Sequence, residues 1–323
     1  LWRHVFPPNE RDHAFALLPS NPSLGLAGEG RGGGFRRVTF DRWRIDACPH
    51  HGPSLAIAAD GTRHAVWFDQ VNGEGRAFYG RLTDSGPSGV MQLPSGATHA
   101  DLAVAGDVVA IAWKRFDGSA TRVESWLSSD RGRTFSRGVV MQTQSESDQP
   151  RLIRGKENIL LAWQRAEGLA VAKLVPVGRA SARQDVVGLK SDPQATSMSV
   201  APFTRDTLAK IERRYAGSPF LLMLWDLECT YCMRSLRNLA NAQRERPDLK
   251  VVTVTTDSFE AAPQITRRLQ ELGVRSQAYA FAAGPPEALR YAIDPGWMGE
   301  KPRAYRYEPD GSRESISGVI ERF

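Results

Sequence analysis

The stretch Phe220-Leu-Leu-Met-Leu-Trp225-Asp226-Leu227-Glu228-Cys229-Thr230-Tyr231-Cys232 joins a short apolar run to two cysteines spaced as C-x-x-C. The six apolar residues 220–225 have the length of a buried strand, and we predict that a helix begins at Cys229. Unpaired backbone N–H groups and the positive end of the helix dipole stabilise a thiolate at such a position. Cys232 would lie one turn deeper, close enough to attack a mixed disulfide and release the substrate.

Helices and strands are predicted to alternate on both sides of this stretch. Asp257-Ser258 is expected to cap the helix that follows the second strand. The pattern is a βαβ half followed by a hairpin. The predicted helices are Thr207–Tyr215, Phe259–Leu272 and Pro286–Ala292, and the predicted strands are Lys250–Thr255, Ala278–Phe281, Ala304–Tyr307 and Ser315–Val319.

A C-x-x-C between a buried strand and a helix resembles the active-site corner of the thioredoxin fold, most closely that of the TlpA/ResA-like and redoxin-like extracytoplasmic reductases. The resemblance spans about residues 205–320. It implies that Cys229 is the exposed nucleophile and Cys232 the resolving thiol, with their redox-active disulfide as the only cofactor needed. It also implies a protein thiol or disulfide as substrate and an electron-donor protein. The alternative is a structural or metal-binding cysteine pair.

The resemblance also indicates which residues contact substrate. Trp225, Thr230 and Tyr231 flank the cysteine pair, and Lys301-Pro302 precedes a predicted strand. In this fold a cis-proline opposite the C-x-x-C leaves the preceding backbone able to pair with an incoming peptide. The alternative is that the proline only begins an edge strand.

Three departures from the family pattern bear on the redox chemistry. Thr230-Tyr231 contains no histidine, which the strongest oxidants of this fold use, and Met223 stands where many thioredoxins carry a buried carboxylate. Glu228 lies beside the first cysteine and should oppose thiolate formation. We therefore predict a moderately reducing pair, with Asp226, Glu228 or water relaying protons to the resolving thiol.

The first ~177 residues are predicted to form short strands separated by turns, unlike the alternating helices and strands of the later part of the chain. Three apolar segments end in tryptophan at intervals of 46 and 50 residues, and each follows a strand that begins after a polar corner. One tryptophan and several strands per unit are typical of β-propeller blades. The three segments are His64–Trp67, Ala110–Trp113 and Leu160–Trp163.

The loop Ser128-Ser-Asp130-Arg-Gly132-Arg-Thr134-Phe135 resembles the Asp-box of sialidase-like propellers. In that motif Ser and Asp tie a tight turn, Gly supplies a positive φ and the aromatic ring wedges between blade strands. Residues 1–177 would supply about three and a half blades, so we expect further blades from an upstream, separate or cleaved segment. No Arg-Ile-Pro segment of the sialidase type occurs, which argues against sialidase activity.

Length and composition fit two globular domains. The 323 residues are 41% hydrophobic and 24% charged, with a net charge of +6 and scattered arginines. This charge pattern does not indicate nucleic-acid binding, and no apolar stretch reaches the length of a membrane span. We predict an all-β propeller part (1–177), a linker (178–204) and an α/β thioredoxin-like domain (205–323). The resemblance places the protein in the periplasm or elsewhere outside the cytoplasm, although the chain begins at Leu1 without a visible signal segment.

One cysteine and several histidines in the propeller part remain to be explained. Cys48, His50, His51 and His99 could form a site for Cu(I) or Zn(II). They could equally be polar channel residues and a buried thiol. A third interpretation makes Cys48 the internal redox substrate of Cys229.

These observations predict an extracytoplasmic thiol–disulfide oxidoreductase whose propeller recognises a partner protein. The alternative is a non-enzymatic binding or scaffold protein, with copper handling through the Cys/His cluster.

Overall fold

The structure is a computed structural model that describes residues 1–16, 35–48, 50–71, 74–155, 158–174 and 200–323. The chain divides into two compact units. One unit comprises Leu1–Arg44 with His51–Ser181, and the other comprises Ile45–His50 with Ala182–Phe323. The short segment Ile45–His50 therefore belongs to the second unit, although the predicted boundary assigned all of residues 1–177 to the propeller part.

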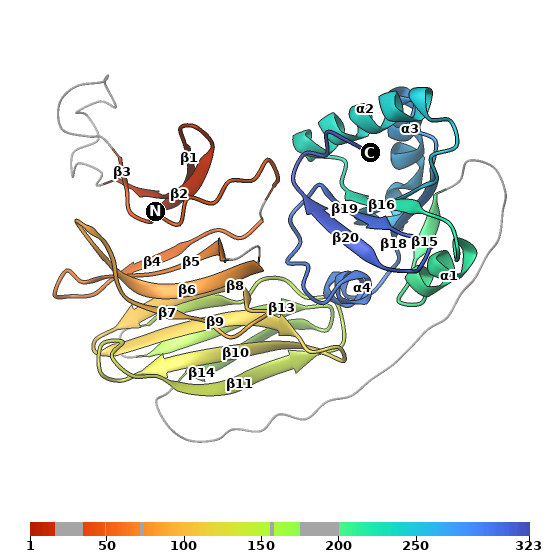
Figure 1. Ribbon diagram of the computed structural model, residues 1–323. Helices are drawn as coiled ribbons and strands as arrows, with labels where there is room; N and C mark the ends of the chain where they lie inside the picture. Colours follow the sequence, from red (N-terminus) through yellow and green to blue (C-terminus); the bar gives the residue numbers. More distant parts are fainter. Residues whose placement is uncertain (17–34, 49, 72–73, 156–157, 175–199) are drawn as a thin grey trace. The chain divides into compact units, whose positions relative to one another are not determined.

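The described residues of the first unit form four antiparallel sheets, which confirms the all-β prediction. Two sheets have four strands and two have three (Figure 1). The strands are β1 (Trp2–Phe6), β2 (Glu10–Phe15), β3 (Arg36–Arg37), β4 (Ser54–Ile57), β5 (Arg63–Val71), β6 (Glu74–Thr83), β7 (Gly86–Gln92), β8 (Thr98–Ala105), β9 (Val108–Phe116), β10 (Thr121–Ser128), β11 (Ser136–Thr143), β12 (Arg151–Arg154), β13 (Ile159–Arg165) and β14 (Gly168–Leu174).

The tryptophan repeat marks the same place in three of these sheets. Trp67, Trp113 and Trp163 lie on β5, β9 and β13, each the second strand of its sheet, and all three side chains are buried. A bulky apolar residue at an equivalent position fills the space between neighbouring blades. The regular spacing of the tryptophans in the sequence therefore reflects a repeated packing unit, as predicted.

The loop after β10 has the geometry expected from its sequence. The Asp130 carboxylate accepts hydrogen bonds from the backbone N–H groups of Arg133 (3.0 Å) and Thr134 (2.9 Å). Gly132 has φ +75°, a conformation that favours glycine, and its N–H donates to the Ser128 hydroxyl at 2.8 Å. These bonds fix a tight turn between β10 and β11.

The second unit is a six-stranded mixed sheet with helices on both faces, as expected for a thioredoxin-like fold (Figure 1). The strand order is β15-β18-β17-β16-β19-β20. The elements are β15 (Ala201–Phe203), α1 (Thr207–Arg214), β16 (Phe220–Trp225), α2 (Thr230–Glu245), β17 (Val251–Ser258), η1 (Phe259–Ala261), α3 (Ala262–Leu272), β18 (Gln277–Phe281), α4 (Pro286–Ile293), β19 (Arg303–Tyr307) and β20 (Arg313–Ser317).

Strand β16 is central because both of its faces are covered. It pairs in parallel with β17 and antiparallel with β19, and all six of its side chains are buried. Met223 and Trp225 pack into the cluster that α2 and α3 cover, whereas Leu222 and Leu224 face the cluster under α1 and α4. This double coverage explains the unbroken apolar run in the sequence.

Two differences from the predicted elements concern the ends of the domain. Most of the predicted linker 178–204 lies outside the described residues, but Ala201–Phe203 within it forms β15, paired in parallel with β18. The predicted helix over 259–272 begins as a 3₁₀ turn, because the Ser258 hydroxyl caps Glu260 and Pro263 permits a fresh helical start.

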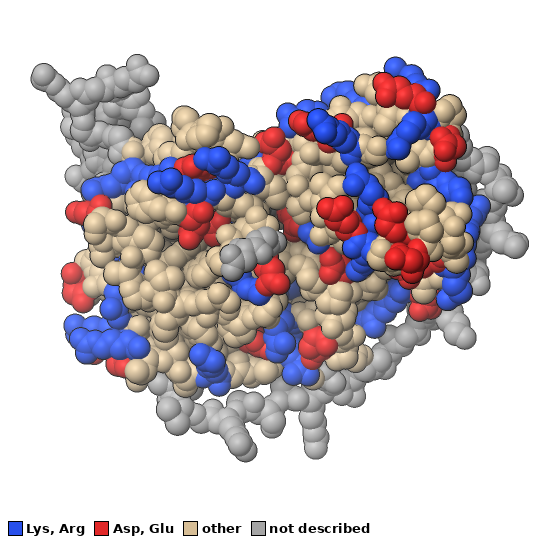
Figure 2. All heavy atoms as spheres, in the orientation of Figure 1, with Lys and Arg blue, Asp and Glu red and all other residues tan. Residues whose placement is uncertain are grey.

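The described surface carries both charge signs. Figure 2 shows Lys and Arg interspersed with Asp and Glu over the face in view. Among the described helices none combines the length and the apolar character needed to cross a membrane.

Candidate redox site

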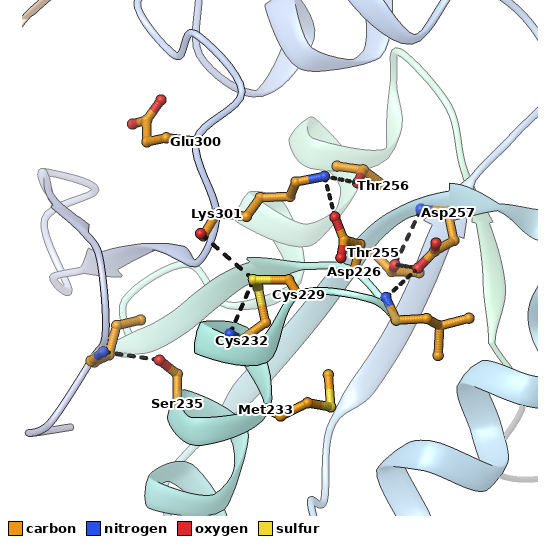
Figure 3. Close-up of a disulfide and its surroundings, with 12 residues drawn as sticks. Asp226, Cys229, Cys232, Met233, Ser235, Thr255, Thr256, Asp257, Glu300 and Lys301 are labelled. Atoms are coloured by element: carbon orange, nitrogen blue, oxygen red, sulfur yellow. Dashed lines mark hydrogen bonds and ion pairs between the residues drawn. A yellow bond between two sulfur atoms is a disulfide. The ribbon is translucent and has the colours of Figure 1, made fainter. Parts of the chain in front are cut away.

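The cysteine pair lies where β16 gives way to α2 (Figure 3). Cys229 occupies the N-cap of α2, and its Sγ accepts the backbone N–H of Cys232 at 3.1 Å. The two cysteines form a disulfide with their Cα atoms 5.1 Å apart. A sulfur that receives a backbone N–H at a helix N-terminus is favoured as a thiolate after reduction.

Burial of the pair differs from one of the predictions. Cys232 is fully buried, as expected for a resolving thiol, but Cys229 is also only 3% exposed. The prediction of an exposed nucleophile is therefore wrong for this state of the molecule. Of the neighbouring residues expected to contact substrate, Trp225 is completely buried, whereas Thr230 is exposed and Tyr231 is half-buried. Thr230 and Tyr231 thus remain candidates for direct contact, and Trp225 supports the site from within the core.

Lys301-Pro302 lies opposite the pair and has a cis peptide bond, as predicted. The Lys301 carbonyl oxygen is 3.6 Å from the Sγ of Cys229. The Lys301 ammonium instead turns inward, forms an ion pair with Asp226 and donates to the Thr256 hydroxyl at 2.8 Å. The Lys301 backbone therefore faces the reactive pair, while its side chain pairs with Asp226 at the start of the turn-forming stretch that leads to Cys229 (Figure 3).

A second carboxylate fixes the turn that leads to the cysteines. The Asp257 carboxylate accepts the Leu227 N–H at 2.9 Å and a hydrogen bond from the Thr255 hydroxyl. Asp257 was expected to cap the following helix, but it lies inside β17, and Ser258 provides the cap. In the sequence, an Asp next to a Ser at the end of a strand predicts a helix cap. The contact of Asp257 with Leu227 depends on the parallel pairing of β16 with β17, which the local sequence does not show.

The predicted Cys/His cluster is divided between the two units. His51 and His99 belong to the first unit, where their rings lie 4.5 Å apart and His51 stacks on Phe68 at 4.1 Å. Cys48 and His50 belong to the second unit. Among the described residues, three ligand atoms come within 4.8 Å of one another at Asp12, Asp41 and Asp69. The copper site at Cys48, His50, His51 and His99 stays a prediction.

His50 and Cys48 instead lie beside the reactive corner. The Cys48 N–H donates to the Lys301 carbonyl at 2.7 Å, and the two residues form an isolated antiparallel bridge. Burial and the nearby Lys301 ammonium lower the pKa of His50, which favours its neutral form. No local sequence pattern predicts this contact, because Cys48 lies between β3 and β4 in the chain, far in sequence from Lys301.

A cluster of three aspartates makes the stability of the first unit depend on pH. Carboxylate oxygens of Asp12, Asp41 and Asp69 lie within 4.8 Å of one another, and Asp69 is fully buried. Burial and the nearby Asp41 carboxylate raise the pKa of Asp69 to about 8, against the opposing influence of the Arg3 cation. The folded state therefore keeps a proton on Asp69 that the unfolded chain loses near pH 4.

We expect the first unit to lose stability as the pH rises from 6.5 to 8, by at most about 1.4 kcal/mol per pH unit from Asp69. Below pH 6.5 an opposite contribution begins, because burial lowers the pKa of His13 to about 3 and protonation then favours the unfolded chain. Urea unfolding of the wild type and of Asp69→Asn at several pH values measures the difference. Equal slopes for both proteins in this window would contradict the assignment.

Comparison with known proteins gives matches in structure only. No family model matches the sequence, and no curated protein matches it. A secreted Mycobacterium tuberculosis disulfide oxidoreductase homologous to E. coli DsbE is 18% identical over 33% of this chain and 73% of its own (TM-score 0.27). M. tuberculosis DsbF is 15% identical over 33% and 75% (TM-score 0.27). A Penicillium chrysogenum α-L-arabinanase is 12% identical over 42% of this chain and 48% of its own (TM-score 0.29).

Proposed function

We propose that the protein is an extracytoplasmic thiol–disulfide oxidoreductase. The observation that supports this most directly is the position of Cys229 at the N-cap of α2, with Cys232 one turn deeper and the Lys301-Pro302 backbone opposite. A protein disulfide or thiol is the substrate, and a separate electron-donor protein restores the dithiol. The periplasm is the proposed location, and the propeller part recognises the partner protein.

The reaction proceeds in two exchange steps. In the reduced protein the Cys229 thiolate attacks one sulfur of the substrate disulfide, and the other substrate sulfur leaves as a thiolate. The Cys232 thiolate then attacks the Cys229 sulfur and releases the second substrate thiolate. The products are a dithiol substrate and the Cys229–Cys232 disulfide, so two electrons have moved from the protein to the substrate.

The corner offers one buried carboxylate for proton transfer during the second step. Met223 is apolar and buried, and Glu228 is exposed to solvent. Asp226 is buried beside the site and paired with Lys301. We assign proton exchange with the resolving thiol to Asp226, acting with solvent, and keep the prediction of a moderately reducing pair.

A trapping experiment tests the proposal. Cys48→Ser/Cys232→Ser should accumulate a mixed disulfide between Cys229 and a substrate protein such as insulin, because no other thiol of the chain remains to resolve it. Electrophoresis without reductant and mass spectrometry of the linked peptides identify the adduct. Cys229→Ser, which retains Cys232, is the matched control and should trap little.

Failure of Cys48→Ser/Cys232→Ser to trap any disulfide through Cys229 would overturn the enzymatic proposal. It would favour the alternative, a non-enzymatic binding or scaffold protein, with copper handling through the Cys/His cluster.

A further inference from the structure

The segment Ile45–His50 is packed as part of the thioredoxin-like unit. Ala47 is completely buried and Ile45 is 7% exposed. Asp46 forms an ion pair with Arg234 of α2 at 3.1 Å. The segment also lies close to Gly318, where an added Cβ would be 3.4 Å from the Ile45 side chain. Apolar burial, an ion pair and close backbone packing therefore hold the segment in one place.

Within this segment, Cys48 pairs with the backbone position that the fold offers to an incoming peptide. Its N–H donates to the Lys301 carbonyl at 2.7 Å in an antiparallel bridge. Addition of an extended segment to backbone groups of this kind is a general mode of peptide recognition. Ile45–Cys48 thus occupies the peptide position beside Pro302 with residues of the same chain.

The same contact brings a third sulfur to the reactive pair. The Lys301 oxygen that accepts the Cys48 N–H is also 3.6 Å from the Cys229 Sγ. The Cys48 side chain packs against the apolar cluster that contains both Cys229 and Cys232. Two independent sets of contacts, along the backbone and in the core, therefore place Cys48 next to the disulfide.

We infer that Ile45–Cys48 is a built-in peptide ligand of the redox site and that Cys48 is its exchanging thiol. This inference rests on the proposed thiol–disulfide chemistry. The Cys48 thiolate attacks the Sγ of Cys229, the Cys48–Cys229 bond forms and the Cys229–Cys232 bond breaks. Its electron pair leaves on Cys232, which takes up the proton that Cys48 released to solvent. No net oxidation occurs, so the step needs no further reactant.

This arrangement regulates access to the site. While the segment is bound, an external peptide finds the Lys301 backbone engaged and Cys229 covered. An intramolecular ligand competes at a high effective concentration, so an external substrate reacts at a rate set by the fraction of molecules in which the segment is displaced.

The covalent part of the inference is tested in the full chain. Cys232→Ser is equilibrated with oxidised and reduced glutathione at low protein concentration, quenched with acid and digested without reduction. We expect mass spectrometry to find the peptides of Cys48 and Cys229 joined within one molecule as the main product. Cys229→Ser, in which only Cys48 and Cys232 can pair, and the double variant Cys48→Ser/Cys232→Ser are the controls.

The outcomes separate this inference from the proposed function. If Cys48→Ser/Cys232→Ser traps insulin through Cys229 but Cys232→Ser never links Cys48 to Cys229, the oxidoreductase stands and the built-in ligand is refuted. If neither bond forms, both proposals fail. Linkage in Cys232→Ser, absent from Cys48→Ser/Cys232→Ser, supports the inference.

Displacement of the segment gives a second readout that does not need Cys48. In a Cys48→Ser background, Ala47→Arg places a long charged side chain where the segment is fully buried, and Asp46→Arg sets a like charge against Arg234. Either change should raise the rate at which dithiothreitol reduces the Cys229–Cys232 disulfide by about tenfold or more. Asp46→Arg alters a partly exposed position and serves if Ala47→Arg fails to fold. Unchanged reduction rates in folded variants would overturn the role of the segment as a cover.

Discussion

Replacing Cys229 by serine is expected to lower the steady-state reduction of insulin disulfides by about a thousandfold or more. A serine hydroxyl does not ionise near neutral pH, so the N–H that Cys232 donates to this position no longer has a thiolate to stabilise. Cys232 cannot take over the attack, because its side chain is fully buried one turn deeper. The rate of insulin reduction, coupled to dithiothreitol as electron source, measures the loss.

An exposed position on the same helix serves as the control. Arg237 lies on α2, so Arg237→Ala should leave the reduction rate within a few fold of the wild type and should preserve folding. If Cys229→Ser keeps most of the activity while Cys232→Ser abolishes it, the roles of the two cysteines are reversed. If both keep it, the pair is not the reactive site.

The elements that the sequence predicted best are those with local causes. Strand β16 has the predicted bounds, because six consecutive apolar residues fit only a strand buried on both faces. Helix α2 begins directly after Cys229, because the Cys229 side chain accepts a backbone N–H and so caps the N-terminus of the helix. The tryptophans of the first unit repeat because each blade needs the same filling group.

What the sequence could not predict depends on contacts between distant segments. A buried strand has no alternation of polar and apolar residues, so nothing in it showed that Trp225 faces the core rather than a substrate. Asp226 and Lys301 are far apart in the chain, and neither has a local partner pattern. Cys48 was assigned with the histidines next to it, whereas its backbone pairs with Lys301, far away in the sequence but in the same unit.

Replacing Lys301 by methionine is expected to destabilise the thioredoxin-like unit by about 3–5 kcal/mol. The Lys301 and Asp226 side chains are only 11% and 13% exposed, and one Asp226 oxygen, Oδ1, has no hydrogen-bond partner among the described residues. Methionine keeps most of the volume of the lysine stem but leaves a buried carboxylate without its cation. Chemical denaturation, with hydrogen exchange of the β16 amides to assign the change to this unit, measures the loss.

A double variant separates the lost ion pair from lost packing. In Lys301→Met/Asp226→Leu no charge remains buried, so most of the stability should return, whereas loss of the lysine stem would leave the double variant as unstable as the single one. A loss below about 1 kcal/mol would show that the pair does not stabilise the corner. The buried Lys301 side chain holds in place the Lys301 backbone, which contacts both Cys229 and Cys48. Its replacement should therefore lower the stability of this corner.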